Sequence, residues 1–422
     1  MKIRALGLLM AALLLFGCGG QTDVPAVSAP PGEPVAQSTP HESNSALPEG
    51  FILGMDASSV IAEEQSGVKY YGFSGEEQDV FLTLSECGIT HIRVRVWNDP
   101  YDADGNGYGG GNCDVQKAVE IGRRAAKVGL QLIVDFHYSD FWADPGKQQA
   151  PKAWQGMELA EKTDALFIFT RDALNELKTA GAAVGMVQLG NETNSGLCGE
   201  TEWENVTALM KSGARAVREV FHDALIAVHF TNPEQAGLFA FYAETLQNFG
   251  VDYDVFATSY YPFWHGTLEN LQRVLGDVAR AYGKQVMVLE TSYPYTPDDT
   301  DFSGNTIHGD TANIAAPYPF TVQGQADSVR AVIETVANTE NGVGVVYWEG
   351  TWISVGTDLW EANHQKWETY GSGWASSFAK DYDPTDAGSY YGGCAVDNQA
   401  MFDATGHPLD SLLIWKIVRE GK

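Results

Sequence analysis

Basic residues are scarce in this chain of 422 residues, which has 26 Lys and Arg against 55 Asp and Glu. The formal charge of −29 repels nucleic acid phosphates and anionic lipid surfaces, so we expect neither as a partner. Disorder of the whole chain is excluded too, because hydrophobic residues make up 44% of it and can bury a large core. Aromatic residues are plentiful at 11%, and such richness in an acidic protein suits stacking on a neutral ligand such as a sugar.

Cysteine is also scarce, and its five positions include no CxxC pair or His-Cys cluster that would indicate zinc. Beyond the N-terminal segment lie Cys87, Cys113, Cys198 and Cys394, which the sequence allows to pair in three ways. Disulfide formation is possible if the protein is exported, because an exported protein meets oxidising surroundings. The sequence does not decide which cysteines pair. Cys87 lies in an apolar helical pattern, and we predict it to be a buried free thiol.

The N-terminal hydrophobic run, at residues 5–16, is too short to span a bilayer stably. It follows two basic residues and ends just before Cys18, an order typical of a bacterial secretory signal with a lipobox. We therefore expect residues 1–18 to be a lipoprotein-type signal peptide, with Cys18 acylated. Phe16 departs from the usual box, which leaves ordinary cleavage nearby as an alternative. Residues 19–49 are rich in Pro, Ser, Gly and Thr and predict a flexible tether. We therefore expect an exported protein whose folded domain is attached to a membrane only through the lipid on Cys18.

From residue 50 onward, short apolar runs alternate with amphipathic stretches. The apolar runs lie at residues 52–56, 90–96, 130–136, 185–190, 224–229, 253–259, 285–290 and 343–348. Helical patterns lie at residues 114–128, 158–180, 203–221, 266–283, 321–338 and 408–419. Alternating strands and helices predict a parallel sheet, and eight repeats fit a (β/α)8 TIM barrel over residues 50–422. A doubly wound α/β fold, the alternative, would have a Gly-rich phosphate-binding turn after the first strand. The sequence there is Met55-Asp-Ala-Ser-Ser59 instead.

Polar and aromatic residues occupy nearly every predicted strand end, which is where the chemistry of such barrels lies. These residues are Asp56, Arg93, Arg95, Trp97, Asp135, His137, Asn191, Glu192, Tyr260, Glu290 and Trp348. Each side chain alone has an ordinary structural explanation, such as a helix cap, an internal salt bridge or packing. Together they predict a lined pocket at the mouth of the barrel.

Two of these carboxylates, Glu192 after the fourth run and Glu290 at the end of the seventh, lie nearly opposite in a ring of eight strands. A retaining glycosidase needs a protonated carboxyl on the leaving oxygen and an ionised carboxylate as nucleophile, about 5–5.5 Å apart. We expect the two arginines of the second strand to keep Glu290 ionised, and His137 or Tyr260 to donate a hydrogen bond to it. The alternative is a pair of barrel-mouth glutamates held in salt bridges.

Four sequence runs lie at or shortly after the second and third strands. They are Arg93-Val-Arg-Val-Trp-Asn-Asp-Pro100, Gly105-Asn-Gly-Tyr-Gly-Gly-Gly111, Asp135-Phe-His-Tyr-Ser-Asp-Phe-Trp-Ala-Asp-Pro-Gly-Lys-Gln148 and Pro151-Lys-Ala-Trp154. With them the chain resembles family 53 of the glycoside hydrolases over about residues 54–412. The resemblance implies a clan A (β/α)8 enzyme, an endo-β-1,4-galactanase that cuts the galactan side chains of pectin with retention. It also implies Glu192 as acid/base, Glu290 as nucleophile, Asn191 on the sugar 2-hydroxyl and Trp348 under the −1 sugar.

Further substrate contacts are expected from the third of these runs and from residues 349–407, a segment too long for an ordinary loop. That segment carries Trp352, Trp360, Trp367, Trp374, Tyr390 and Tyr391. Long aromatic loops at a barrel mouth line extended clefts, which suits an endo-acting enzyme, although a small self-packed lid is the alternative. The expected substrate-binding residues are Asp56, Arg95, Trp97, His137, Trp142, Asp144, Lys147, Asn191, Tyr260, Trp348 and Trp360.

Two places in the sequence are candidates for calcium. Residues 102–107 begin like a calcium loop, but position twelve is Cys113 instead of Glu, and a tight turn is the other use. The family resemblance implies a better site, because bacterial members carry a calcium ion between the loops after strands 7 and 8. The matching positions are Asp301, Ser303, Asn305, Cys394 and Asp397. Ser303 and Cys394 stand where His and Ser are expected, and they fit if they bind through backbone carbonyls.

The sequence leaves three functions open. The first is a surface-tethered galactanase that acts as a monomer on β-1,4-galactan. The second is a catalytically silent glycan-binding lipoprotein on a barrel scaffold, which would have no reason to keep both glutamates. The third is an enzyme of the same fold on another β-linked polymer, such as mannan or glucan, which the residue spacing does not exclude.

Overall fold

The computed structural model describes residues 46–356, 359–389 and 392–422, and eight parallel strands in it close into a barrel in sequence order. The strands are β1 (Ile52–Asp56), β2 (His91–Val96), β3 (Gln131–Phe136), β4 (Val184–Leu189), β5 (Leu225–Phe230), β6 (Val255–Ser259), β7 (Gln285–Glu290) and β8 (Gly342–Tyr347). β1 pairs with both β2 and β8, which closes the ring. The predicted (β/α)8 TIM barrel is therefore confirmed. The predicted signal peptide, the acylated Cys18, most of the predicted tether, Tyr390 and Tyr391 lie outside the described residues.

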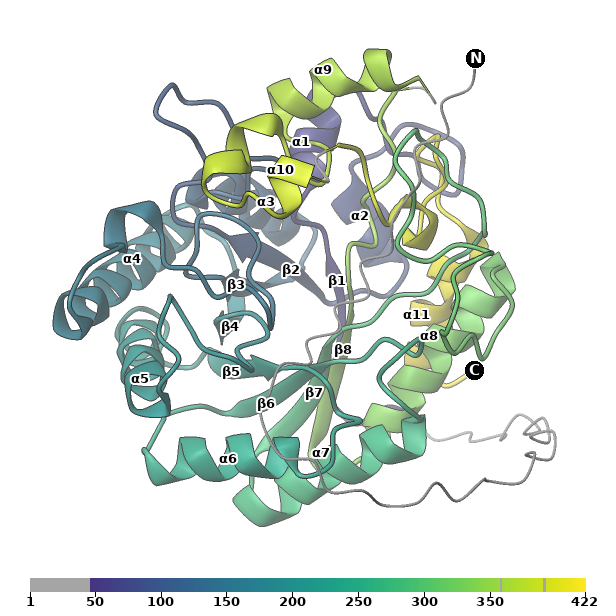
Figure 1. The fold of residues 1–422 in the computed structure, drawn as a ribbon. Coiled ribbons are helices and arrows are strands. Elements are labelled where there is room, and N and C mark those ends of the chain that lie inside the picture. Colours follow the sequence, from purple (N-terminus) through teal and green to yellow (C-terminus); the bar gives the residue numbers. More distant parts are fainter. Residues whose placement is uncertain (1–45, 357–358, 390–391) are drawn as a thin grey trace, which may run out of the picture. The chain divides into compact units, whose positions relative to one another are not determined.

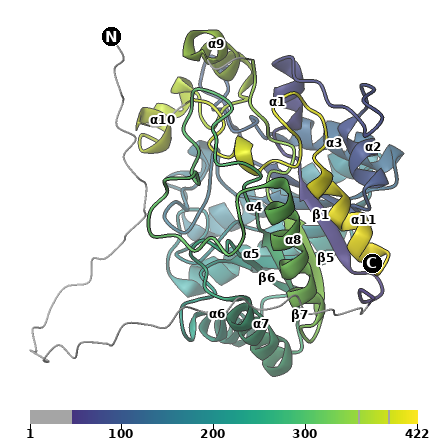
Figure 2. The same ribbon diagram turned by 90° about the vertical axis from the view of Figure 1, so that its right-hand side faces the viewer.

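Helices surround the strands, as the two views in Figures 1 and 2 show. The α-helices are α1 (Val60–Gln65), α2 (Val80–Glu86), α3 (Val115–Lys127), α4 (Leu159–Thr179), α5 (Trp203–Val220), α6 (Leu238–Asn248), α7 (Leu268–Tyr282), α8 (Val322–Ala337), α9 (Trp360–Tyr370), α10 (Asp386–Ser389) and α11 (Ile414–Arg419). Short 3-10 helices are η1 (Lys152–Trp154), η2 (Ser377–Asp381), η3 (Asp397–Gln399) and η4 (Asp410–Leu413). Side-chain caps begin several of them; Asp114, for example, accepts a hydrogen bond from Lys117 N at the start of α3. No helix among the described residues is long and apolar enough to cross a membrane.

The barrel interior changes from apolar to polar along the strands. Inward-facing apolar side chains such as Ile133, Met186 and Ala227 fill its lower part, and a larger apolar layer packs between strands and helices. Two residues farther along the same strands, the inward side chains are Asp135, Gln188 and His229, all fully buried. Because side chains alternate across a strand, these polar groups face the same interior as the apolar ones below them. The strands thus present a buried polar layer to the mouth of the barrel.

Aromatic side chains form a separate cluster at this mouth, under the loops that follow β2, β3 and β8. Its buried members include Trp97, Tyr108, Phe141, Trp142 and Trp352. The four cysteines in the described part of the chain are buried and free, which confirms the prediction for Cys87. Burial raises the pKa of the Cys87, Cys113 and Cys198 thiols to about 12, so they stay protonated at neutral pH.

Candidate active site

Two carboxylates converge at the mouth of the barrel, Glu192 in the turn after β4 and Glu290 as the last residue of β7. Ser259, the last residue of β6, contacts both, since its Oγ lies 2.6 Å from Glu192 Oε1 and 3.3 Å from Glu290 Oε2. The two contacted carboxylate oxygens therefore cannot be farther apart than the sum of these two distances. That separation falls below the range of about 6.5–9.5 Å typical of inverting glycosidases and is compatible with a retaining pair.

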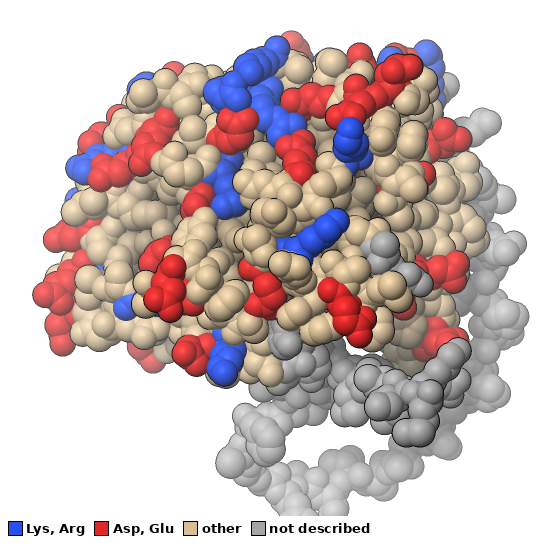
Figure 3. Space-filling view, turned by 90° about the horizontal axis from the view of Figure 1, so that it is seen from above, with Lys and Arg blue, Asp and Glu red and all other residues tan. Residues whose placement is uncertain are grey.

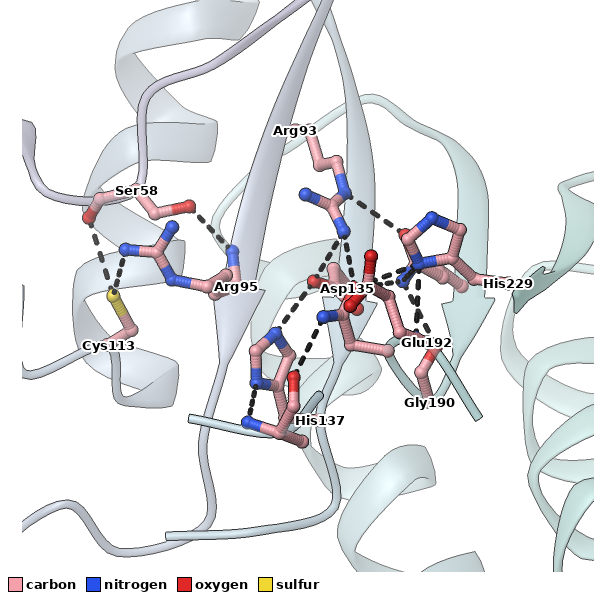
Figure 4. Close-up of polar contacts among 12 residues, drawn as sticks. Ser58, Arg93, Arg95, Cys113, Asp135, His137, Gly190, Glu192 and His229 are labelled. Atoms are coloured by element: carbon pink, nitrogen blue, oxygen red, sulfur yellow. Dashed lines mark hydrogen bonds and ion pairs between the residues drawn. The ribbon is translucent and has the colours of Figure 1, made fainter. Parts of the chain in front are cut away.

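Arg93 is the central cation of the site and is completely buried. Its Nη1 lies 2.9 Å from Asp56 Oδ2, and its Nη2 lies 2.9 Å from both Asp135 Oδ2 and Glu290 Oε1. Figure 4 shows the guanidinium pointing into the group of residues around Asp135 and Glu192. The prediction that strand β2 supplies a positive charge to Glu290 is confirmed for Arg93.

The surroundings give the two glutamates different proton affinities. Burial, together with the charge of Glu290, raises the pKa of Glu192 to about 8. Burial also raises the pKa of Glu290, but the positive charge of Arg93 and a hydrogen bond from Tyr261 oppose this rise. The two carboxyls titrate as a pair, and these surroundings favour the proton on Glu192 and the negative charge on Glu290. The arrangement provides an acid and an ionised nucleophile side by side.

The hydroxyl that serves Glu290 belongs to Tyr261, whose Oη donates to Glu290 Oε2 at 3.0 Å. The prediction of Tyr260 in this role is wrong, because its hydroxyl donates instead to the Gly266 carbonyl at 2.9 Å. Simple alternation along β6 explains the difference: Val255 and Ala257 face the barrel interior, so Tyr261 faces it too, whereas Tyr260 packs in the layer between strands and helices. The irregular pairing of β6 with β7 has its extra residue on β7, where Leu289 precedes Glu290.

His137 does not serve Glu290 either, so that prediction is also wrong. Its Nδ1 accepts hydrogen bonds from Trp97 Nε1 at 3.0 Å and from Ala143 N at 3.2 Å. The ring proton is therefore on Nε2, which donates to Asp135 Oδ2 at 3.0 Å. Asp135 in turn contacts Arg93, so His137 orients the carboxylate that helps to fix the central arginine.

The turn that carries the acid/base candidate is held in an unusual conformation. Glu192 has a φ of 45°, in the left-handed region that non-glycine residues seldom adopt. Its backbone N–H donates to His229 Nδ1 at 3.3 Å, and Gln148 Nε2 donates to the Asn191 carbonyl at 2.8 Å. Burial lowers the pKa of His229 well below its usual value, so the ring is neutral and can accept this bond. Strained turns of this kind cluster at functional sites.

Arg95, the second arginine of β2, forms a different ion pair. Its Nη1 contacts Glu349, which directly follows Trp348, and its guanidinium lies 4.4 Å from the centroid of the Trp142 ring. Glu349 is buried, has a φ of 51° and also accepts a hydrogen bond from Ser59 Oγ at 2.9 Å. The expectation that Arg95 acts on Glu290 is wrong. This arginine instead pairs with Glu349, next to Trp348, and packs against the ring of Trp142.

We expect Glu349→Gln to lower the melting temperature and to raise KM for the substrate more than it lowers kcat. The substitution leaves the buried Arg95 guanidinium short of a counter-charge, which costs about 3–5 kcal/mol when a buried pair is broken. Thermal unfolding and steady-state kinetics measure both effects. Glu120→Gln is the matched control, because it breaks an exposed ion pair with Arg123 and should change neither quantity appreciably. A Glu349→Gln melting curve equal to that of the control would contradict this role.

The predicted substrate-binding residues divide by accessibility. Asp56, Arg95, Trp97, His137 and Tyr260 have buried side chains that contact other residues of the barrel mouth, and their binding of substrate stays a prediction. Asp144, Lys147, Trp348 and Trp360 are partly exposed and form the accessible group, and Asn191 and Trp142 are buried at 7% exposure each.

Three of the accessible residues have clear surroundings. Trp348 is half-buried beside the aromatic cluster of the mouth. Lys147 Nζ lies 3.1 Å from Asp383 Oδ2 and also contacts Asp386, so it ties the loop after β3 to the segment after β8. Trp360 begins α9 and stacks on His364 within that helix at 4.0 Å between ring centroids.

Sequence reasoning missed five residues that shape the site, namely Gln188, His229, Ser259, Tyr261 and Glu349. The first three had a signal, because they are polar residues at inward positions of apolar strands. Tyr261 had a signal as well, because it continues the alternation of Val255, Ala257 and Ser259. Glu349 had none, because its role depends on a contact across 254 residues of sequence.

The two loops predicted to hold calcium do come together. Asn305 Nδ2 donates to Asp397 Oδ1 at 2.9 Å, and Cys394 N donates to Asp301 Oδ2 at 3.1 Å. Ser303 N also donates to Asp301, at 2.6 Å. Burial and mutual repulsion raise the pKa of Asp301 to about 7, and burial raises that of Asp397 to about 6. Within the described ranges, no cluster of three or more His, Cys, Asp or Glu side chains is arranged to hold a metal ion.

Residues 102–107, the other calcium candidate, form a tight turn. Both oxygens of Asp102 are occupied, since they accept hydrogen bonds from Asn106 N at 2.8 Å, Asn106 Nδ2 at 2.9 Å and Asp104 N at 2.9 Å. The alternative of a structural turn therefore describes this loop.

A model of glycosyl hydrolase family 53 matches residues 52–415. The chain belongs to this family. It is 56% identical over 374 residues to the endo-β-1,4-galactanase of Bacillus subtilis (strain 168). This match covers 88% of this chain and 86% of that protein. The arabinogalactan endo-β-1,4-galactanase of Humicola insolens is 32% identical, over 71% of this chain and 89% of its own length. Among solved structures, the family 53 catalytic domain of Ignisphaera aggregans has a TM-score of 0.77 at 34% identity and covers 88% of this chain and 97% of its own.

Proposed function

We propose that this chain is a retaining endo-β-1,4-galactanase, with Glu192 as acid/base and Glu290 as nucleophile. The observation that carries the proposal is the pair of carboxylates bridged by Ser259, of which Glu290 alone contacts the charge of Arg93. The family membership and the galactanases among its relatives support β-1,4-galactan as the substrate.

In the first step, a carboxylate oxygen of Glu290 attacks the anomeric carbon while the glycosidic C–O bond breaks. Glu192 gives its proton to the leaving oxygen, so that the departing chain ends in a hydroxyl. Ser259 occupies Glu192 Oε1, which leaves Oε2 to carry the proton toward the substrate. Arg93 and Tyr261 stay on Glu290 and keep its charge available until the bond forms.

The second step uses the same residues in the opposite sense. Formation of the glycosyl ester removes the negative charge of Glu290, which is one of the causes of the high pKa of Glu192. The pKa of Glu192 then falls, and the ionised carboxylate takes a proton from water, whose oxygen attacks the anomeric carbon and releases Glu290. Two inversions at one carbon leave the anomeric configuration unchanged.

The aromatic cluster gives the substrate a surface on which to lie. Trp348 and Trp374 are half-buried at its edge, and Trp142 stacks on Trp374 with 4.5 Å between ring centroids. Acidic side chains are spread over the face of the molecule drawn in Figure 3, which suits a neutral polysaccharide better than an anionic one. Incubation with linear galactan, mannan and cellulose tests the substrate: internal cleavage of galactan alone supports the proposal, and cleavage of only one of the others overturns it.

A bound calcium ion between the loops after β7 and β8 is a further part of the proposal. The donors fit a hard cation, because two buried carboxylates lie in the same small region and the buried Asn305 Oδ1 has no hydrogen-bond partner in the part of the chain described. Asp301, Asn305 and Asp397 would hold the ion, with Ser303 and Cys394 as neighbours through their backbones. Its charge would tie the two loops together without taking part in the reaction.

Chelation with EDTA should therefore lower the melting temperature and raise KM more than it lowers kcat. An ion that binds only the folded state stabilises it by mass action, and the loop it holds follows directly from the strand of Glu290. The same titration with Asp397→Asn should show a smaller shift, whereas Asp298→Asn, an exposed change in the same loop, should behave like the parent. Equal melting curves in EDTA and excess calcium, with no metal on elemental analysis, would refute the site.

We also infer that the chain is exported and held on a bacterial membrane through an acylated Cys18. The inference rests on the order of two basic residues, an apolar run and a lipobox-like end, followed by a tether with almost no large apolar residue. Cys18→Ser should release the protein from the membrane fraction into the soluble one. Unchanged fractionation of this variant would rule the anchor out.

A further inference from the structure

A cavity outside the catalytic site opens at the rim of the barrel mouth. Its volume is ≈ 370 Å³, within the range of about 300–1,000 Å³ of small-molecule sites. It lies between the loop after β2, the C-terminal ends of α1 and α9, and η2. In Figure 1, α9 and α1 are seen side by side above the barrel.

Aromatic rings from three segments line this cavity. Tyr370 ends α9 and is 38% exposed, Phe378 belongs to η2 and is 36% exposed, and Tyr101 lies in the loop after β2. Large side chains left this accessible on two neighbouring segments offer apolar faces for the C–H groups of a ligand.

The polar groups of the cavity favour an uncharged partner. The side chains of Gln65, Thr369 and Tyr370 make no hydrogen bond with any described residue, so their donors and acceptors are available. The two charged lining residues are already engaged. Lys117 Nζ lies 3.0 Å from Tyr101 Oη and 3.8 Å from Asp114 Oδ2, and Glu368 accepts from Ser377 N at 2.8 Å.

The loop that forms one wall of the cavity, with Gly107 and Asn112, also contacts the aromatic cluster of the active site through Gly110. The backbone N–H groups of Gly110 and Gly111 donate to the carbonyls of Gly373 and Gly371, at 2.7 and 2.8 Å. A Cβ at Gly110 would lie 2.8 Å from both Trp97 and Trp142, so only glycine lets this wall approach the cluster so closely. A ligand in the cavity would thus be held beside the cleft.

We propose that this cavity is a second binding site for a neutral saccharide chain, which on the proposed function is the galactan polymer itself. Apolar ring faces combined with free amide and hydroxyl groups match a polyol whose rings carry C–H patches and hydroxyls. A polymer held here stays at high local concentration near Glu192 and Glu290, whereas a short oligosaccharide occupies one site at a time.

The test compares Tyr370→Ala/Phe378→Ala with Phe241→Ala, a control that removes a ring 48% exposed on α6. All variants are made on the inactive Glu290→Gln background and run on native gels that contain linear galactan. We expect the cavity variant to bind the polymer about tenfold more weakly, which corresponds to about 1.4 kcal/mol, and the control to bind like the parent. Retardation of the cavity variant equal to that of the control would overturn the proposal.

Kinetics on the active background separate this site from the catalytic one. The cavity variant should show a raised KM for polymeric galactan and unchanged kcat and KM for a short galacto-oligosaccharide. Thr369→Arg, an exposed change that fills the cavity, should weaken polymer binding in the same way if the double variant does not fold; normal retardation of Thr369→Arg would then overturn the site. If the unmodified enzyme fails to cleave galactan, the proposed function falls, and the gels still show whether the cavity binds the chain.

Discussion

Glu290→Gln is expected to lower kcat on linear galactan by about 10⁴-fold or more, with little change in melting temperature. The amide preserves the shape of the side chain but cannot form the glycosyl ester, so the covalent route is lost. Initial rates of reducing-end formation measure the effect, and Glu120→Gln, an exposed substitution, is the control. A Glu290→Gln rate near that of the parent would place the nucleophile elsewhere.

The two glutamates should also differ in rescue by azide on an activated aryl β-galactoside. In Glu290→Ala, azide has room to replace the nucleophile and attacks the substrate directly, so the product is the α-azide. In Glu192→Ala, the ester with Glu290 still forms and azide replaces water, so the product is the β-azide. A β-azide from the Glu290 variant would require the two roles to be exchanged.

Arg93→Lys is expected to lower kcat/KM by about 10²–10³-fold and to move the acid limb of its pH profile to higher pH. Arg93 lies 2.9 Å from each of three carboxylates, and an ammonium group cannot reproduce that fork of contacts. Since the positive charge lowers the pKa of Glu290, a poorer contact lets this pKa rise. As pH falls, Glu290 then becomes protonated sooner and activity is lost sooner.

Arg95→Lys is the matched comparison, because Arg95 lies on the same strand but pairs with Glu349. It should lower the melting temperature and leave the acid limb where it is. In both variants the alkaline limb should still reflect Glu192, whose pKa is about 8 and whose proton is needed by the leaving group. Equal shifts of the acid limb in the two variants would contradict the assignment of Arg93 to Glu290.

The fold was predictable because strands and helices leave periodic patterns. The run at 285–290 and β7 coincide, and the predicted helix at 203–221 differs from α5 by one residue. The run at 253–259 began two residues early, because Tyr253 is buried without belonging to the β6 ladder. An apolar pattern indicates which residues are buried, but it does not indicate which of them pair with a neighbouring strand.

The candidate site was predictable in its carboxylates and less so in their partners. Glu192 and Glu290 stand at strand ends whose order around the barrel follows from counting runs. The choice between Tyr260 and Tyr261 follows from alternation along β6, because Tyr261 shares the parity of the inward-facing Val255 and Ala257 and Tyr260 does not. Arg93 and Arg95 have the same parity, and only their height along β2 separates their partners.

The most direct test of the central claim is a proton NMR time course of galactan cleavage that records the anomeric form of the first products. A nucleophile at Glu290 and an acid/base at Glu192 require two inversions, so the account predicts that new reducing ends appear as the β-anomer. The α-anomer should then grow only at the slower rate of mutarotation. Initial release of the α-anomer would contradict the mechanism.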